Sequence, residues 1–237
     1  MDATRDPDDP AVPTPAALPD LVDRCAHLVS DSSSGHRRVL GIAGPPGAGK
    51  TTLVAALLRA GAADPRLAGR VAHVPMDGFH LSSADLRRMG RLDRKGAPDT
   101  FDVEAYAALL AAVRASPRAA VWAPAFDHGV GEPEAGAIEV GFAADLVVTE
   151  GNYLLLDDPA WRSVRALLDE AWFCDLADDE RRQRLIERHV RTGRALDDAT
   201  AWVDRSDEAN ARLVAGGRDV AAVVLVDGRI VGGTPHS

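Results

Sequence analysis

Residues 44–51 read Gly44-Pro45-Pro46-Gly47-Ala48-Gly49-Lys50-Thr51, and this stretch decides the fold. It matches the pattern G-x-x-x-x-G-K-[ST], which is typical of a phosphate-binding loop. The apolar residues 38–43 before it predict a short buried strand, and residues 52–59 after it predict a helix. The order strand, glycine loop, helix is the context in which this pattern binds a nucleoside triphosphate.

Each residue type in the loop has a physical role. The glycines allow a tight turn whose N–H groups point inward, where they and the start of the following helix hold phosphate oxygens. Lys50 would place its charge on the terminal phosphates, and the Thr51 hydroxyl would bind Mg²⁺. The alternative is a Gly/Pro-rich turn that binds nothing. The motif itself does not say what is done with the nucleotide.

Composition bounds the remaining possibilities. The chain has 237 residues, 46% of them hydrophobic, which predicts one α/β domain. Its net charge of −9 argues against a broad nucleic-acid or anionic-membrane surface. Residues 1–17, rich in aspartate and proline, predict a disordered tail before a domain spanning 18–231. Two cysteines and the lack of a signal-peptide or membrane-span pattern predict a cytoplasmic protein.

Strands and helices alternate along the sequence, which predicts a mainly parallel sheet with helices on both faces. The strands beginning at residues 38, 71 and 145 end at the glycine loop, at Asp77 and at Glu150. Ligands bind at the carboxyl ends of such strands, so these groups should converge. Glu150 would hold Mg²⁺ or its waters, and Asp77 would accept a proton from an attacking hydroxyl. Capping of a loop or turn is the alternative for both acids.

Basic residues recur near these strand ends. Arg181, Arg184, Arg188 and Arg191 are spaced to form one stripe on a helix. Such a stripe suits a lid over a transferring phosphoryl group, although i,i+4 pairs with glutamates would equally make it a solvated face. Segment 180–194 carries six arginines against two glutamates, which favours the lid.

Three further segments are candidates for substrate contacts. His80 follows Asp77 closely and would contact a substrate, serve as an alternative base, or be structural. The basic loop 91–98 would bind an anionic or polyhydroxylated substrate or be solvated. The stretch 123–142 is rich in glycine and proline and predicts mostly loop, and residues 126–128 within it carry only a weak signal. The loop at 227–229, after the last strand, is the candidate for adenine contacts.

Several blocks together resemble a known superfamily. They are the glycine loop, Met76-Asp77-Gly78-Phe79-His80, Arg94-Lys95-Gly96-Ala97-Pro98, Pro124-Ala125-Phe126-Asp127-His128 and Glu150-Gly151-Asn152-Tyr153. The chain resembles the P-loop kinases that include uridine kinase, phosphoribulokinase and bacterial pantothenate kinase. Within them it is most similar to a bacterial nucleoside/nucleotide kinase-like branch, also labelled fructose-transport-associated kinase. The resemblance spans roughly residues 18–226.

This resemblance implies a three-layer α/β P-loop fold with a helical lid at about residues 178–197. Its five-stranded parallel sheet would have the order 2-3-1-4-5, numbering the strands that end at residues 43, 76, 149, 174 and 226. The site residues it implies fall into four groups. The catalytic group is Asp77, Lys50, Arg184 and Arg188. The ATP-binding group is Gly44, Pro45, Pro46, Gly47, Ala48, Gly49, Lys50, Thr51, Thr52 and Arg191. The substrate-binding group is Asp77, Phe79, His80, Arg94, Lys95, Phe126, Asp127, His128, Glu150, Asn152 and Tyr153. The Mg²⁺ group is Thr51, Glu150 and Asp77.

The segment after Asp77 departs from uridine kinases, which usually carry a hydroxyl residue and an aromatic there. Gly78, Phe79 and His80 favour the pantothenate-kinase-like or sugar-kinase-like side. We therefore expect an ATP- and Mg²⁺-dependent kinase acting on a hydroxyl of a sugar, a nucleoside or a pantothenate-like alcohol. A non-catalytic nucleotide-binding regulator and a GTPase-type switch are the alternatives, and the sequence does not separate a monomer from a homodimer. Nucleic acids and membranes are not expected partners.

Overall fold

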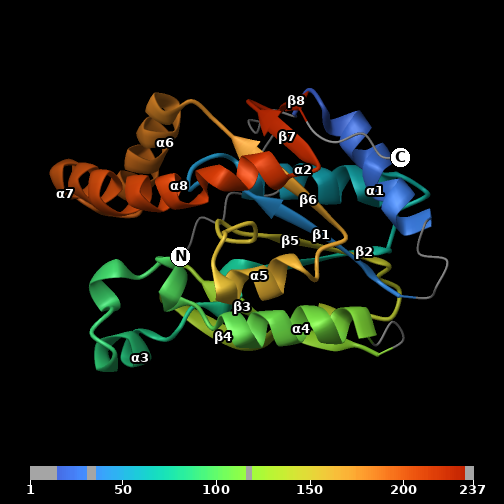
Figure 1. Cartoon of the computed structure of the whole chain (residues 1–237), viewed down its shortest axis with the longest axis horizontal. Helices are drawn as coiled ribbons and strands as arrows, with labels where there is room; N and C mark the ends of the chain where they lie inside the picture. Colours follow the sequence, from blue (N-terminus) through green and yellow to red (C-terminus); the bar gives the residue numbers. More distant parts are fainter. Residues whose placement is uncertain (1–14, 31–35, 116–118, 233–237) are drawn as a thin grey trace.

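A computed structural model describes residues 15–30, 36–115 and 119–232 of the chain. Its centre is a twisted sheet of six strands in the order β2-β5-β1-β6-β7-β8 (Figure 1). The first five strands in that order pair in parallel. The strands are β2 (Val71–Pro75), β5 (Leu146–Glu150), β1 (Arg38–Ala43), β6 (Glu170–Asp175), β7 (Val223–Val226) and β8 (Arg229–Gly232).

Helices cover both faces of this sheet and give three layers. On one face α1 (Leu18–Ser30) and α2 (Lys50–Ala63) bury an apolar cluster that includes Ile42 and Trp172. On the other face α4 (Val103–Ala115) and α5 (Pro159–Arg165) pack Tyr106 and Trp161 into a second cluster. The central strands β1 and β5 contribute to both clusters, which is why they read as continuous apolar runs. The α/β class with a mainly parallel sheet is thus confirmed.

The predicted number of strands is wrong, because β8 adds a sixth, antiparallel strand beside β7. All four β8 residues are exposed, so the strand lacks the apolar pattern that identifies buried strands. A local signal was present in the sequence. Asp227 and Gly228 both have positive φ, +48° and +70°, and Asp-Gly is a characteristic hairpin turn.

The expectation that residues 123–142 are mostly loop is also wrong. They belong to an antiparallel hairpin of β3 (Val121–Asp127) and β4 (Glu132–Val140), a separate two-stranded sheet. Only Ala123 and Val140 are buried in it, so its composition resembles that of a loop. The hairpin packs against the turn after β2, where a Cβ on Gly78 would lie 2.2 Å from the Pro124 carbonyl oxygen. Glycine is required by this close approach.

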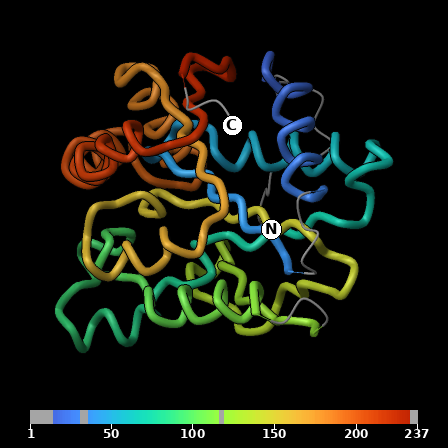
Figure 2. The backbone as a smooth tube through the Cα atoms, turned by 45° about the vertical axis from the view of Figure 1, so that its right-hand side comes forward, coloured from blue at the N-terminus to red at the C-terminus, as the bar shows by residue number. Residues whose placement is uncertain are grey.

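The remaining helices lie on either side of the carboxyl edge of the sheet (Figures 1 and 2). On one side are α6 (Asp178–Arg191), α7 (Leu196–Trp202) and α8 (Glu208–Val214), with a π-helical turn, Val203–Asp207, between the last two. On the other side is α3 (Ser83–Arg88). Residues 196–214 are thus helical throughout, with the π-helical turn joining α7 to α8. Of the expected tail, residues 1–14 lie outside the described residues, and Ala17 is buried with its N–H bonded to the Gly228 carbonyl.

No described helix is both long and apolar enough to cross a membrane.

Candidate active site

The glycine loop lies tightly against the sheet. Gly44 has φ +145°, and a Cβ at this position would lie 2.2 Å from the carbonyl oxygen of Cys174 on β6. After the loop, α2 begins at Lys50, so the positive end of the helix and its free N–H groups face outward from the sheet edge. This is the arrangement that binds phosphate.

Lys50 is buried and held by three oxygen atoms. Its Nζ donates to the carbonyls of Gly44 and Pro45, both at 2.9 Å, and to Asn152 Oδ1 at 2.7 Å. Burial lowers the pKa of Lys50, and the nearby Glu150 carboxylate opposes that shift. An anionic phosphate oxygen is a better partner for a desolvated ammonium than a neutral carbonyl. Lys50 is thus placed to exchange its present partners for a phosphate.

Glu150 lies beside Thr51 at the end of β5. The Thr51 hydroxyl donates to Glu150 Oε1 at 3.0 Å, and the Glu150 side chain is largely buried. The pKa of Glu150 is raised to about 7, chiefly by burial; Lys50 opposes the rise and the Asp77 carboxylate adds to it. A hydroxyl and carboxylates are the oxygen donors that Mg²⁺ prefers, so Thr51, Glu150 and Asp77 fit such an ion.

Among the described residues, no group of three or more His, Cys, Asp or Glu side chains is placed to hold a metal by itself. An ion held at Thr51 and Glu150 would therefore complete its coordination with phosphate oxygens and water, which is the usual situation for Mg²⁺ in nucleotide sites.

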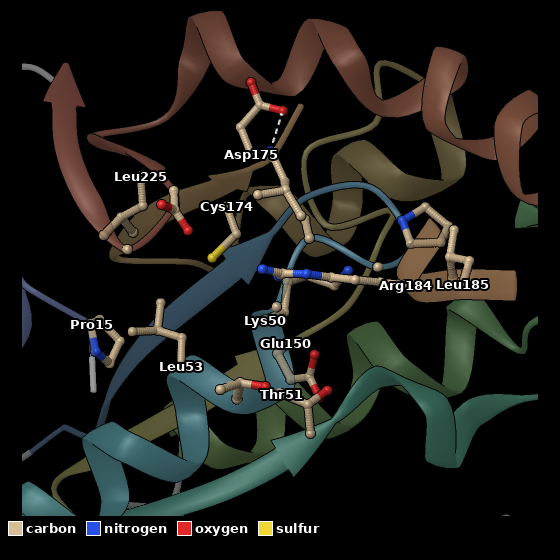
Figure 3. A pocket seen from close by; sticks show the side chains of 18 of the residues that line it. Pro15, Lys50, Thr51, Leu53, Glu150, Cys174, Asp175, Arg184, Leu185 and Leu225 are labelled. Atoms are coloured by element: carbon tan, nitrogen blue, oxygen red, sulfur yellow. Dashed lines mark hydrogen bonds between the residues drawn. The ribbon is translucent and has the colours of Figure 1, made fainter. Parts of the chain in front are cut away.

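One cavity of about 750 Å³ joins most of the predicted groups (Figure 3). Asp77 enters it from the 3₁₀ turn Met76–Phe79 that follows β2. The predicted site residues that line it are Pro46, Gly47, Ala48, Gly49, Lys50, Thr51, Thr52, Asp77, Glu150, Asn152, Arg184, Arg188 and Arg191. Residues from three strand ends and from α6 thus surround one space.

The four arginines of the predicted stripe do not all line the cavity. Arg184, Arg188 and Arg191 line the cavity, and Arg184 also pairs with Glu180 at 2.6 Å. Arg181 does not line the cavity: its side chain is 1% exposed and bonds Asp178 and Glu208. The expectation that all four arginines share one functional face is therefore wrong for Arg181. Arg181 lies in the first turn of α6, where it packs against the glycine loop.

His80 follows Asp77 by three residues and does not line the cavity. Its Nδ1 is 2.8 Å from the Asp77 carbonyl oxygen, and its ring lies between Phe101 and Phe126 with centroid distances of 4.0 and 4.6 Å. Burial lowers the pKa of His80, and the Asp77 charge opposes the shift. The imidazole is therefore neutral at pH 7. With the proton on Nδ1 bonded to the carbonyl, Nε2 is left as an acceptor.

The loop and hairpin residues gather around His80 but do not line the cavity. Lys95 Nζ lies 5.5 Å from the centre of the Phe126 ring, and His128 meets the same ring edge-on at 5.2 Å. Tyr153 donates its hydroxyl to the Gly96 carbonyl at 2.5 Å, which fastens the turn after β5 to this loop.

Three predicted substrate-binding side chains have local partners instead. Phe79 is buried against Tyr106, with ring centroids 4.7 Å apart. Asp127 Oδ1 accepts from the backbone N–H groups of Gly129 and Val130 and so caps the hairpin turn. Arg94 is engaged with Asp99.

The cavity is also lined by residues that were not among the predicted site residues. They are Pro15, Ala16, Leu53, Cys174, Asp175, Leu225, Asp227, Gly228 and Arg229. The turn at 227–229 was identified as a candidate from its place after the last strand. The contribution of Pro15 and Ala16 had no signal in the sequence, because the composition of this segment is that of a tail.

The chain therefore combines a P-loop fold with an acid and cations at the site of phosphate binding, which defines a P-loop kinase. No family model matches the chain. Over 209 residues it is 31% identical to "Putative uridine kinase C227.14" of Schizosaccharomyces pombe, covering 85% of this chain and 87% of that protein. It is 37% identical over 119 residues to the pantothenate kinase of Bacillus velezensis, covering 49% of this chain and 36% of the relative.

Among solved structures, the "putative fructose transport system kinase from Silicibacter sp. TM1040" is 34% identical, with a TM-score of 0.69. The match covers 82% of this chain and 94% of that one. The chain belongs to the P-loop kinase superfamily of uridine kinase, phosphoribulokinase and bacterial pantothenate kinase. The resemblance stated from its motifs is thereby confirmed.

Proposed function

We propose that this protein transfers the γ-phosphoryl group of ATP to a hydroxyl of a small metabolite. The observation that carries the proposal is that Lys50, Asp77 and the arginines of α6 line one cavity at the carboxyl edge of the sheet. A phosphate-binding loop alone would suit any nucleotide hydrolase or switch. A carboxylate beside the terminal phosphate and apart from the loop is what an acceptor hydroxyl requires.

In this mechanism Asp77 accepts the proton of the acceptor hydroxyl as its oxygen bonds to the γ-phosphorus. The bond from that phosphorus to the bridging oxygen breaks, and ADP leaves. Lys50 and the loop amides hold the phosphates, while Arg184 and Arg188 stabilise charge on the moving group. Thr51 and Glu150 would hold Mg²⁺, which neutralises phosphate charge when bound. The helices α6 and α7 would act as the lid that excludes water.

A kinase-dead regulator and a GTPase-type switch are the competing functions. Every group that the transfer needs is present in the cavity, which argues against the regulator. A switch would give Asp77 no role. The acceptor itself is proposed only as a sugar, a nucleoside or a pantothenate-like alcohol.

The direct test is ADP release from Mg-ATP in the presence of sugars, nucleosides, pantothenate and small alcohols. Asp77→Asn is assayed in parallel. Asp93→Asn serves as a control, because it removes one exposed carboxylate from the basic loop at residues 91–98. We expect acceptor-dependent release that is lost in Asp77→Asn and kept in Asp93→Asn. ATP binding without acceptor-dependent release across the panel would favour the regulator.

A further inference from the structure

The charge of the acceptor can be inferred from the segments around Asp77. We infer that the acceptor is an uncharged hydroxyl compound, and that phosphate esters and carboxylates are poor substrates. This inference rests on the proposed kinase function. It decides between the two substrate classes that the basic loop at residues 91–98 leaves open.

The phosphates would occupy the glycine-loop side of Asp77, so we place the acceptor beside the segments that adjoin Asp77 outside the cavity. Two segments adjoin the turn that carries Asp77. One is residues 76–102, which carry His80 and the basic loop; the other is the β3–β4 hairpin, which carries Phe126. Ring contacts between His80 and Phe126, and the place of Lys95 over Phe126, join the two segments into one wall.

The formal charge of this wall is not positive. Residues 76–102 contain five acidic and five basic residues, and residues 121–140 add four acids and no lysine or arginine. A site that collects an anion needs excess positive charge near the ligand. The basic loop is therefore balanced by its own neighbourhood, whereas the phosphate side has Arg184, Arg188 and Arg191 facing the cavity.

Asp99 engages two of the loop arginines. Its Oδ2 lies 2.5 Å from Arg94 Nη2 and 3.4 Å from Arg91 Nε, and its backbone carbonyl accepts from Arg91 Nη1 at 3.1 Å. Both guanidinium groups are thus turned toward one carboxylate. An anionic acceptor would have to compete with Asp99 for them.

Lys95 connects the loop to the hairpin. Its Nζ donates to Ser83 Oγ at 3.0 Å and to the Gly131 carbonyl at 2.6 Å, and it lies 3.8 Å from Glu132 Oε1. Two of the three donors of the ammonium are thus hydrogen-bonded, and its charge lies within ion-pair distance of Glu132. Glu132 also accepts from the Ser83 N–H at 3.1 Å. Lys95 therefore holds the wall together and is not presented to a ligand.

The polar side chains beside Asp77 and Lys50 suit hydroxyls. His80 bonds the Asp77 carbonyl through Nδ1, which leaves Nε2 as an acceptor, and the Asn152 amide bonds Lys50 through its oxygen. Uncharged groups of this kind select a ligand through hydrogen bonds and not through its charge. A polyol or a nucleoside offers the matching donors and acceptors.

Three matched pairs of acceptors test the inference. They are ribulose with ribulose 5-phosphate, uridine with uridine 5′-monophosphate, and panthenol with pantothenate. We expect kcat/KM to be about tenfold or more higher for the uncharged member of any pair that is turned over, because the charged member meets an acidic wall. A higher kcat/KM for the charged member would overturn the inference.

Two variants separate the ion pairs from the general charge of the loop. Asp99→Asn releases Arg91 and Arg94, and we expect it to raise kcat/KM for the charged member about two- to fivefold, the size of an exposed ion pair. Asp93→Asn makes the same charge change at an exposed residue of the same loop for which the described chain shows no ion pair. Because Arg91 and Arg94 keep their partner, Asp93→Asn should change the ratio of kcat/KM for the charged and the uncharged member less than Asp99→Asn does. Equal effects of the two variants would contradict the role of Asp99.

Different results would contradict the charge inference and the proposed kinase function. Turnover with preference for the charged member contradicts the charge inference and leaves the kinase function intact. Absence of acceptor-dependent ADP release from all six compounds, with ATP still bound, contradicts the proposed function, and the inference falls with it.

Discussion

The cavity at the glycine loop and the proposed acceptor region, formed by residues 76–102 and the β3–β4 hairpin, are built by different means. On the phosphate side, backbone geometry dominates: Gly44 has no room for a Cβ, and α2 begins at Lys50. On the acceptor side, side chains from distant segments meet, as when His80 contacts Phe126 and Tyr153 reaches Gly96. The phosphate side is thereby fixed by eight consecutive residues. The acceptor side depends on how separate loops pack.

The cavity and the proposed acceptor region also differ in charge. Lys50 and three arginines line the cavity, whereas the cations of the proposed acceptor region lie in ion pairs with Asp99 and Glu132. A site divided in this way would receive a highly charged donor at one end and an uncharged acceptor at the other. The predictions that follow test this division, beginning with the largest effect.

Asp77→Asn should separate binding from transfer. The amide keeps the shape of the side chain but cannot accept the hydroxyl proton, so kcat should fall by about a thousandfold. ATP affinity should change by no more than about threefold, because the variant leaves the glycine loop intact. Single-turnover kinetics with calorimetric ATP titration would measure both. Near-normal transfer by Asp77→Asn would remove Asp77 from the mechanism.

Lys50→Met should damage both binding and transfer. It removes the charge-assisted contact to the terminal phosphates, and we expect ATP affinity to fall about tenfold and kcat by about a hundredfold. The same titration and rate measurement apply. Unchanged affinity and turnover would reject the role of Lys50 and would mean that the loop amides suffice.

Glu150→Gln should stabilise the ligand-free protein at alkaline pH. The pKa of Glu150 is raised from 4.5 to about 7 in the fold, so the native state binds more protons than the unfolded state between these values. The free energy of unfolding contributed by this group therefore falls as pH rises from about 4.5 to about 7.

Glutamine does not carry this charge, so the variant should be more stable by about 1–3 kcal/mol at pH 8 and by less at pH 5. Urea unfolding at the two pH values, without nucleotide or Mg²⁺, would show it. Equal gains at both pH values would mean that the carboxylate is not the cause.

Arg188→Ala should mainly lower kcat, whereas Arg181→Met should mainly shift Tm. Arg188 lines the cavity, so its loss should lower kcat about tenfold with little change in Tm. Arg181 is buried with Glu208, so its replacement should shift Tm through the loss of that pair, in a direction set by how well methionine fills the space. Thermal unfolding and steady-state rates on both variants would test the division of the stripe. A large Tm shift for Arg188→Ala with unchanged kcat would contradict it.

The sequence predicted the phosphate side well, because the residues that form it are local. The class of fold followed from the strand, loop and helix around Lys50. Asp77 and Glu150 followed from the rule that parallel strands end at one edge. These inferences need only the order of elements along the chain.

The sequence predicted the acceptor side less well, and the reasons are physical. The β3–β4 hairpin is exposed on both faces over much of its length, so it has no apolar alternation to recognise. Spacing on α6 placed Arg181 in line with Arg184 but did not show that Arg181 is buried against the glycine loop. The lysine and arginine content identified the basic loop, but only the structure shows that the Asp99 and Glu132 carboxylates pair with it.

The central claim is that the γ-phosphoryl group goes to an organic hydroxyl and not to water. The most direct measurement follows γ-labelled ATP with the acceptors of the screen and separates the labelled products. The account predicts label in a phosphorylated acceptor, in amounts equal to the ADP formed, and none with Asp77→Asn. Label found only in inorganic phosphate, at a rate that no acceptor changes, would contradict it and identify a nucleotide hydrolase.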